Sequence, residues 1–91
     1  MTYIHVSRTP TISLEEYDRV RAAMGPEPLE GNLEHHVGLE DGALCVVDAW
    51  TSKDHADRFA ATRLFPAFAA AGVHPADGQT MFGFDATTES R

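Results

Sequence analysis

The chain is poor in several residue types on which whole classes of protein depend. Its 91 residues include one cysteine, Cys45, so no disulfide can form within the chain. It has 7 basic residues against 14 acidic ones, which gives a net charge of −7, and Lys53 is its only lysine. Because contacts with phosphates need clustered lysine and arginine, we expect neither nucleic acid nor a membrane as a partner.

Sequence patterns typical of targeting segments and of cofactor sites are also missing. No apolar run is long enough to span a bilayer and no signal-peptide pattern opens the chain, so we expect a cytoplasmic protein. There is no glycine-rich phosphate loop, no dinucleotide fingerprint and no zinc-type spacing of histidines, so we expect no cofactor and no metal. The length and the 43% hydrophobic content suit one globular domain over residues 1–91, with a polar tail at 86–91.

Two apolar-rich runs joined at Asp41-Gly42 predict a β-hairpin made of residues 33–40 and 43–50. Asp-Gly favours a type I′ turn, because both central residues of that turn need a positive φ. Counting outward from the turn gives the pairs that face each other, and alternation along a strand puts them on one face of the ribbon. These pairs are Val37 with Val46, His35 with Asp48, and Leu33 with Trp50.

The pairing of His35 with Asp48 is the best functional clue in the sequence. A carboxylate that accepts from one imidazole nitrogen fixes the tautomer and makes the other nitrogen a better base. The same two residues would also form a self-satisfied buried pair that only sets the strand register, and the sequence leaves both readings open. A metal held by His5, His35 and Asp48, or a haem on His35, is geometrically conceivable, but no ligand spacing supports either.

Several neighbours of this pair are candidates for a hydrophobic binding pocket. Trp50 would provide a flat wall for an aromatic ligand, although a tryptophan at a strand end is also typical of a core or a dimer interface. The sequence places six residues as candidate substrate contacts, with His5 close to Asp48 or else exposed at the surface: Trp50, Leu33, Val37, Val46, Tyr3 and His5.

The order of the expected elements predicts the fold. A strand in residues 1–7 is followed by a helix that Ser13 and Glu16 begin with capping-box spacing and Gly25 ends. After the hairpin, Thr51 or Ser52 begins a second helix, which we expect to break near Leu64-Phe65 before Pro66 starts a short helix that Gly72 ends. Residues 73–78 form a loop, and 80–85 the last strand.

This order is that of an α+β ferredoxin-like fold, βαββαβ, an antiparallel sheet with both helices on one face. We expect the helices to leave the face with Leu33, Val37, Val46 and Trp50 open to water. Such an apolar patch is rare in monomers. We therefore expect a homodimer in which this face of two sheets forms a barrel, with a pocket between each sheet and its partner.

Three segments, GNLEHHVG, VVDAWTSKDHADRF and RLFPAFAAAG, resemble the small dimeric α/β-barrel proteins, among them the antibiotic-biosynthesis-monooxygenase-like group and its uncharacterised bacterial relatives. The resemblance spans about residues 3–85. Asp48 and Trp50 before a capped helix match that group, and His35 matches a histidine of one uncharacterised branch. The resemblance implies the fold, whereas the group's chemistry ranges from cofactor-free oxygenation of polycyclic aromatics to haem degradation and lactone isomerisation.

We therefore expect a small dimeric enzyme that acts without a cofactor on a hydrophobic cyclic or aromatic metabolite. It would be an oxygenase, isomerase or cyclase that begins by proton abstraction, with His35 as the base and Asp48 as the residue that orients it. The alternative is a dimer without catalytic activity that binds a small molecule or plays a structural role.

Overall fold

The computed structural model describes residues 2–74 and 78–88. Parts of the predicted first strand, of the loop at 73–78 and of the tail at 86–91 lie outside these residues. In chain order the elements are β1 (Tyr3–Thr9), α1 (Leu14–Met24), β2 (Asn32–Glu40), β3 (Ala43–Trp50), α2 (Lys53–Phe59), the π-helical segment η1 (Ala60–Leu64), α3 (Phe65–Ala71) and β4 (Thr80–Asp85).

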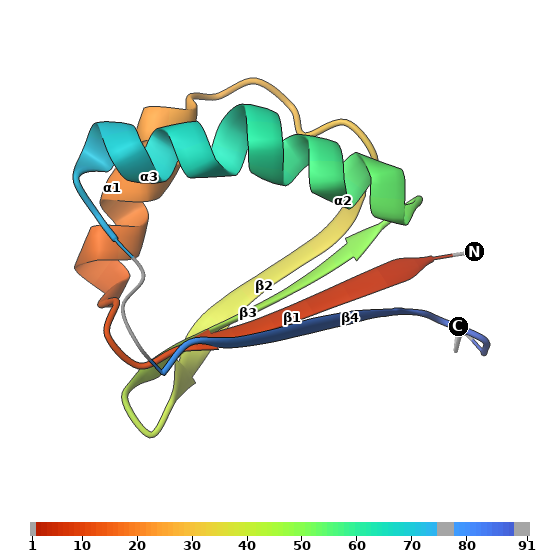
Figure 1. Cartoon of the computed structure of the whole chain (residues 1–91), viewed down its shortest axis with the longest axis horizontal. Coiled ribbons are helices and arrows are strands. Elements are labelled where there is room, and N and C mark those ends of the chain that lie inside the picture. Colours follow the sequence, from red (N-terminus) through yellow and green to blue (C-terminus); the bar gives the residue numbers. More distant parts are fainter. Residues whose placement is uncertain (1, 75–77, 89–91) are drawn as a thin grey trace.

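The strands form one antiparallel sheet in the order β2-β3-β1-β4. Figure 1 shows α1 and the continuous helical segment from α2 to α3 together on one side of this sheet. The predicted ferredoxin-like fold is therefore confirmed. No helix among the residues described is both long and apolar enough to cross a membrane.

The β2–β3 hairpin has the predicted turn and, over most of its length, the predicted register. Asp41 and Gly42 have φ of 50° and 79°, as a type I′ turn requires. His35 pairs with Asp48 and Val37 with Val46. The predicted pairing of Leu33 with Trp50 is wrong, because a β-bulge between Asn32 and Glu34 makes Asn32 the partner of Trp50.

The predicted exposure of the bulky hairpin face holds for Leu33, which is 53% exposed, and is wrong for the rest of that face. Trp50 is 2% exposed and packs against Phe59 of α2, with ring centroids 5.0 Å apart. Val37 and Val46 pack against the core that Val20 and Leu44 help to form. Two helices bury most area when they cover the bulkier face of a sheet, so this face lies inside the molecule and the face with smaller side chains lies outside.

The sheet face turned away from the helices, called the open face below, is nevertheless apolar. It carries Phe82 and Phe84 of β4, which are 58% and 49% exposed and whose rings stack with centroids 6.3 Å apart. The register continues this face onto β1 and then β3: Ile4 pairs with Phe84 and Val6 with Phe82 across β1 and β4, and Val6 pairs with Val47 across β1 and β3. The apolar patch predicted for the sheet exists, on the opposite face.

The helices begin and end much as their sequences predict. Ser13 and Glu16 form both hydrogen bonds of a capping box, and Gly25 ends α1 with φ 83°. Ser52 caps α2 by accepting from the His55 N–H. As predicted, a boundary falls at Leu64-Phe65, and a short helix with Pro66 in its first turn follows and ends at Gly72. The boundary is a change of helix type and not an interruption, because the Phe65 N–H bonds back to the Ala60 carbonyl and the chain stays helical. This π turn leads Pro66 into the first turn of α3, where no N–H donor is needed.

Gly83 permits a close approach that holds Tyr3 in the fold. A Cβ at Gly83 would overlap the end of the buried Tyr3 ring and lie 3.1 Å from the Ile4 carbonyl. We expect Gly83→Ala to lower the free energy of unfolding by about 1–3 kcal/mol, because the rigid ring and the β1 backbone must move. Gly38→Ala is the matched control, since nothing lies within 4 Å of its added Cβ. Equal melting temperatures for the two variants would contradict this packing.

Candidate functional site

Three side chains form a hydrogen-bonded chain on the helix side of the sheet, called the proton chain below. His35 Nδ1 lies 2.5 Å from Asp48 Oδ1, and His35 Nε2 lies 2.8 Å from the Tyr17 hydroxyl. β2 provides His35, β3 provides Asp48 and α1 provides Tyr17. The predicted pairing of His35 with Asp48 is therefore a direct contact, and it has a third member.

The charge of Asp48 fixes the direction of the hydrogen bonds. Its carboxylate only accepts, so Nδ1 of neutral His35 carries the proton and Nε2 is left as an acceptor. The Tyr17 hydroxyl then donates to Nε2. Burial, followed by the negative charge of Asp48, raises the pKa of Tyr17 to about 12, which keeps this phenol protonated at neutral pH.

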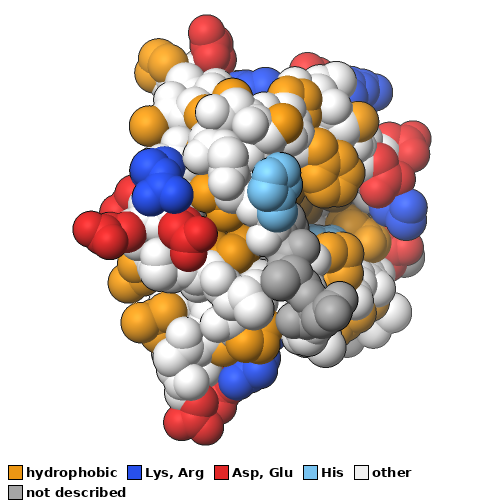
Figure 2. Space-filling model, turned by 60° about the vertical axis from the view of Figure 1, so that its left-hand side comes forward, with side chains coloured by type: hydrophobic (Ala, Val, Ile, Leu, Met, Phe, Trp, Pro, Cys, Tyr) orange, Lys and Arg blue, Asp and Glu red, His pale blue; other side chains and the backbone are white. Residues whose placement is uncertain are grey.

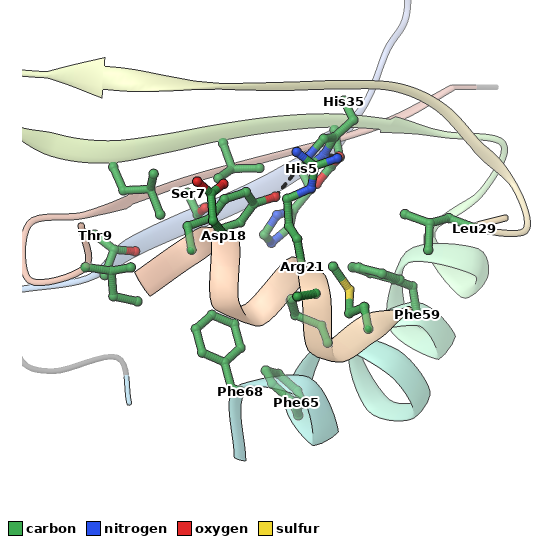
Figure 3. A pocket seen from close by; sticks show the side chains of 18 of the residues that line it. His5, Ser7, Thr9, Asp18, Arg21, Leu29, His35, Phe59, Phe65 and Phe68 are labelled. Atoms are coloured by element: carbon green, nitrogen blue, oxygen red, sulfur yellow. Dashed lines mark hydrogen bonds and ion pairs between the residues drawn. The ribbon is translucent and has the colours of Figure 1, made fainter. Parts of the chain in front are cut away.

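The proton chain borders a cavity of about 640 Å³ between the sheet and the helices. Figure 3 shows His5 and His35 on the sheet side, with Phe59, Phe65 and Phe68 coming from the helical segment opposite. In Figure 2 apolar side chains are visible in the recesses of the surface, between acidic and basic side chains. A cavity of this size and composition suits a small cyclic or aromatic molecule.

The structure brings together some of the predicted site residues and separates others. His5 pairs with Asp48 across β1 and β3, and His5, Val46, His35 and Asp48 all line the cavity. The other four candidates are not among its lining residues: Trp50, Leu33, Val37 and Tyr3. This cavity lies between the sheet and the helices of one chain, whereas the sequence predicted a pocket between the sheets of two chains.

Sequence reasoning overlooked two lining residues on α1, Tyr17 and Arg21. In the sequence Tyr17 lies at helical spacing from Val20 and Met24 and so resembles a core residue, although a buried tyrosine hydroxyl normally requires a partner. Arg21 is the only lysine or arginine that lines the cavity within the described part of the chain, and its charge acts to lower the pKa of Tyr17. Both point from α1 toward the strand that carries His35, a relation that becomes visible only in the folded chain.

The site can accept and stabilise a proton. His35 would become a cation on protonation, and the Asp48 carboxylate lies in place to balance that charge. Asp48 is largely buried, with a side chain 12% exposed, whereas that of His35 is 29% exposed. Within residues 2–74 and 78–88, no three His, Cys, Asp or Glu side chains are grouped as metal ligands would be.

Solved structures with the same architecture include SnoaB, a cofactor-independent oxygenase from Streptomyces nogalater. It is 21% identical, and the match covers 97% of this chain and 95% of that chain with a TM-score of 0.67. Rv0793 from Mycobacterium tuberculosis is 11% identical over the whole of both chains with a TM-score of 0.71. An antibiotic biosynthesis monooxygenase is 18% identical, over 97% and 100% of the two chains, with a TM-score of 0.66.

The chain has the fold of the antibiotic-biosynthesis-monooxygenase-like proteins. The resemblance that the three sequence segments indicate is thereby confirmed at the level of fold. No protein-family model and no curated protein sequence matches the chain. Within the antibiotic-biosynthesis-monooxygenase-like fold, the roles of Tyr17, His35 and Asp48 rest on the geometry of this chain alone.

Proposed function

We propose that this protein is a cofactor-independent enzyme that abstracts a proton from a hydrophobic cyclic or aromatic metabolite. His35 is the base, and Asp48 orients its ring and balances the charge that forms on it. The observation that carries the proposal is a histidine with a carboxylate on Nδ1, placed at the wall of a cavity of ring-system size. SnoaB, which has the same fold, is a cofactor-independent oxygenase, and this agrees with the proposed chemistry.

The proposed reaction begins with an electron-rich anion. Removing the proton of a phenol or enol leaves an electron pair on the substrate oxygen, and Phe59, Phe65 and Phe68 provide apolar surface beside it. Such an anion would then react with dioxygen in an oxygenase, or accept a proton at another carbon in an isomerase or cyclase. All of these outcomes share the first step, so the first step is what an experiment has to detect.

A screen without a known substrate tests the proposal. Wild-type protein is incubated with two- and three-ring phenols and enolisable cyclic ketones, while dioxygen uptake and deuterium uptake from D₂O are measured. We expect at least one compound to react faster with the protein than without it. Ser7→Phe should slow that reaction by narrowing the cavity beside His5 and Val46 without removing a member of the proton chain. No acceleration for any compound, or full activity in Ser7→Phe, would refute the proposal.

One observation favours the alternative function, a protein that binds a small molecule without catalysis. Tyr17 already occupies His35 Nε2, so the proton chain is satisfied without any ligand. No buried side-chain nitrogen or oxygen among the residues described lacks a partner. Binding of ring compounds that leaves their protons and dioxygen unchanged would support this alternative.

We also propose that the protein is a homodimer in which the open faces of two sheets pack together. The exposed rings of Phe82 and Phe84, together with Val6 and Val47, form an apolar patch of a kind that monomeric proteins rarely expose. A second copy is the partner that the resemblance to dimeric barrel proteins implies. The face proposed here replaces the one that the sequence predicted.

The proposed dimer makes Phe84→Glu a disruptive change. Two copies of an unpaired charge would be buried at the interface, which costs several kcal/mol, so we expect the variant to be monomeric. Leu14→Glu is the control, because Leu14 is similarly exposed but lies on α1, away from the open face. Light scattering on wild type and both variants at micromolar concentration checks this. A monomeric wild type would contradict the dimer.

A further inference from the structure

The acceptor nitrogen of His35 is covered by another side chain. The Tyr17 hydroxyl lies 2.8 Å from Nε2, and Nδ1 is taken by Asp48, so neither ring nitrogen is free to meet a ligand. A ligand in the cavity can reach Nε2 directly only by displacing Tyr17, which is 6% exposed and packed in the core with Val20 and Leu44. The group that such a ligand meets is therefore the oxygen of Tyr17.

A tyrosine oxygen in this position can serve two partners at once. It has one O–H to donate and lone pairs that accept. While it donates to Nε2, a lone pair remains for a hydroxyl hydrogen in the cavity that Tyr17 lines. A carbon-bound hydrogen makes no comparable hydrogen bond, so this arrangement selects a ligand with a hydroxyl group.

We propose that Tyr17 is the catalytic residue that touches the substrate, and that it passes the proton of a substrate hydroxyl to His35. The substrate O–H bond breaks and its proton goes to the Tyr17 oxygen, while the Tyr17 O–H bond breaks and that proton goes to Nε2. The electron pair stays on the substrate oxygen, and the new imidazolium is balanced by Asp48. Tyr17 ends the step neutral, with its O–H directed at the substrate anion. This inference rests on the proposed role of His35 and names the substrate class as phenols and enols.

Two further observations agree with the relay. The pKa of Tyr17 is raised to about 12, so this residue is a neutral donor rather than a standing base, and it needs His35 to accept its proton. The positive charge of Arg21 acts to lower the pKa of Tyr17. Figure 3 shows Arg21 extending from α1 on the side of the cavity where His35 lies. This positive charge opposes the negative charges of Asp48 and Asp18, which both raise the pKa of Tyr17.

Binding of two probes tests the contact without any turnover. 1-Naphthol and naphthalene share their rings and differ in one hydroxyl, and their Kd values are measured by calorimetry on wild type and Tyr17→Phe. We expect wild type to prefer naphthol about 3–10-fold, as one hydrogen bond provides, and Tyr17→Phe to lose this preference. Tyr3→Phe, which removes a hydroxyl outside the cavity lining, should keep it. If Tyr17→Phe keeps or gains the preference, the ligand reaches Nε2 directly and the relay is overturned.

The kcat values of Tyr17→Phe and His35→Ala show separately whether Tyr17 relays the proton and whether His35 is the base. On a compound that the wild type turns over, we expect Tyr17→Phe to lower kcat at least tenfold and His35→Ala to do the same. Loss in His35→Ala with full kcat in Tyr17→Phe would overturn the relay and leave His35 as the base. Loss in Tyr17→Phe with full kcat in His35→Ala would overturn the base and, with it, the transfer to Nε2.

Discussion

Asp48→Asn is expected to lower turnover by about 10²–10⁴-fold while the protein remains folded. The amide has nearly the shape of the carboxylate and can still meet His35 Nδ1, where Asp48 Oδ1 lies 2.5 Å away. The amide cannot balance the imidazolium charge. If its N–H₂ group donates to Nδ1, His35 takes the tautomer that is protonated at Nε2 and has no acceptor there. Steady-state rates on a compound found by the screen provide the measurement.

A surface carboxylate gives the matched control for this loss. Asp57 pairs with Lys53 on the exposed side of α2, so Asp57→Asn should change neither rate nor fold. Thermal melts of both variants separate a loss of chemistry from a loss of structure. If Asp48→Asn unfolds the protein at the temperature of the assay, or keeps the wild-type rate, the pair is structural rather than catalytic.

Alkaline pH is expected to destabilise the protein through Tyr17. Burial raises the pKa of Tyr17 from 10.0 to about 12, so the folded chain holds its proton where the unfolded chain releases it. The resulting stability is present below pH 10 and disappears as pH rises through the interval from 10 to 12. Two pKa units correspond to at most about 3 kcal/mol of unfolding free energy.

Urea denaturation at several pH values between 8 and 12 measures this loss. Tyr17→Phe has no proton to release at this position and should show a flatter profile. The ultraviolet absorbance of tyrosinate follows the same titration in the folded protein. Parallel stability profiles for wild type and Tyr17→Phe would show that Tyr17 is not held in its neutral form by the fold.

Local patterns in the sequence predict much of the fold because their physics is local. The Asp41-Gly42 turn, the Ser13–Glu16 capping box and the strand at 80–85 each depend on residues within a few positions of one another. The hairpin count also places His35 opposite Asp48, and the structure has this contact. One bulge at the far end of the same hairpin is enough to separate Leu33 from Trp50.

The features that the sequence did not predict depend on contacts between distant elements. Which face of the sheet the helices cover is decided by the area buried over the whole layer, and alternation along the hairpin does not choose between the two faces. The contact of Tyr17 with His35 joins α1 to β2, and no spacing in the sequence encodes it. The proton chain thus has two members that a hairpin pattern finds and a third that only the packing of α1 supplies.

Comparison of wild type and His35→Ala on one hydroxylated compound tests the central proposal most directly. The rate of deuterium or dioxygen uptake is measured at equal protein concentration, with melts to show that both are folded. We expect the wild-type rate to exceed that of His35→Ala by about 10²–10⁴-fold, because the variant has no group to receive the substrate proton. Equal rates in the two folded proteins would contradict the role of His35 as the base.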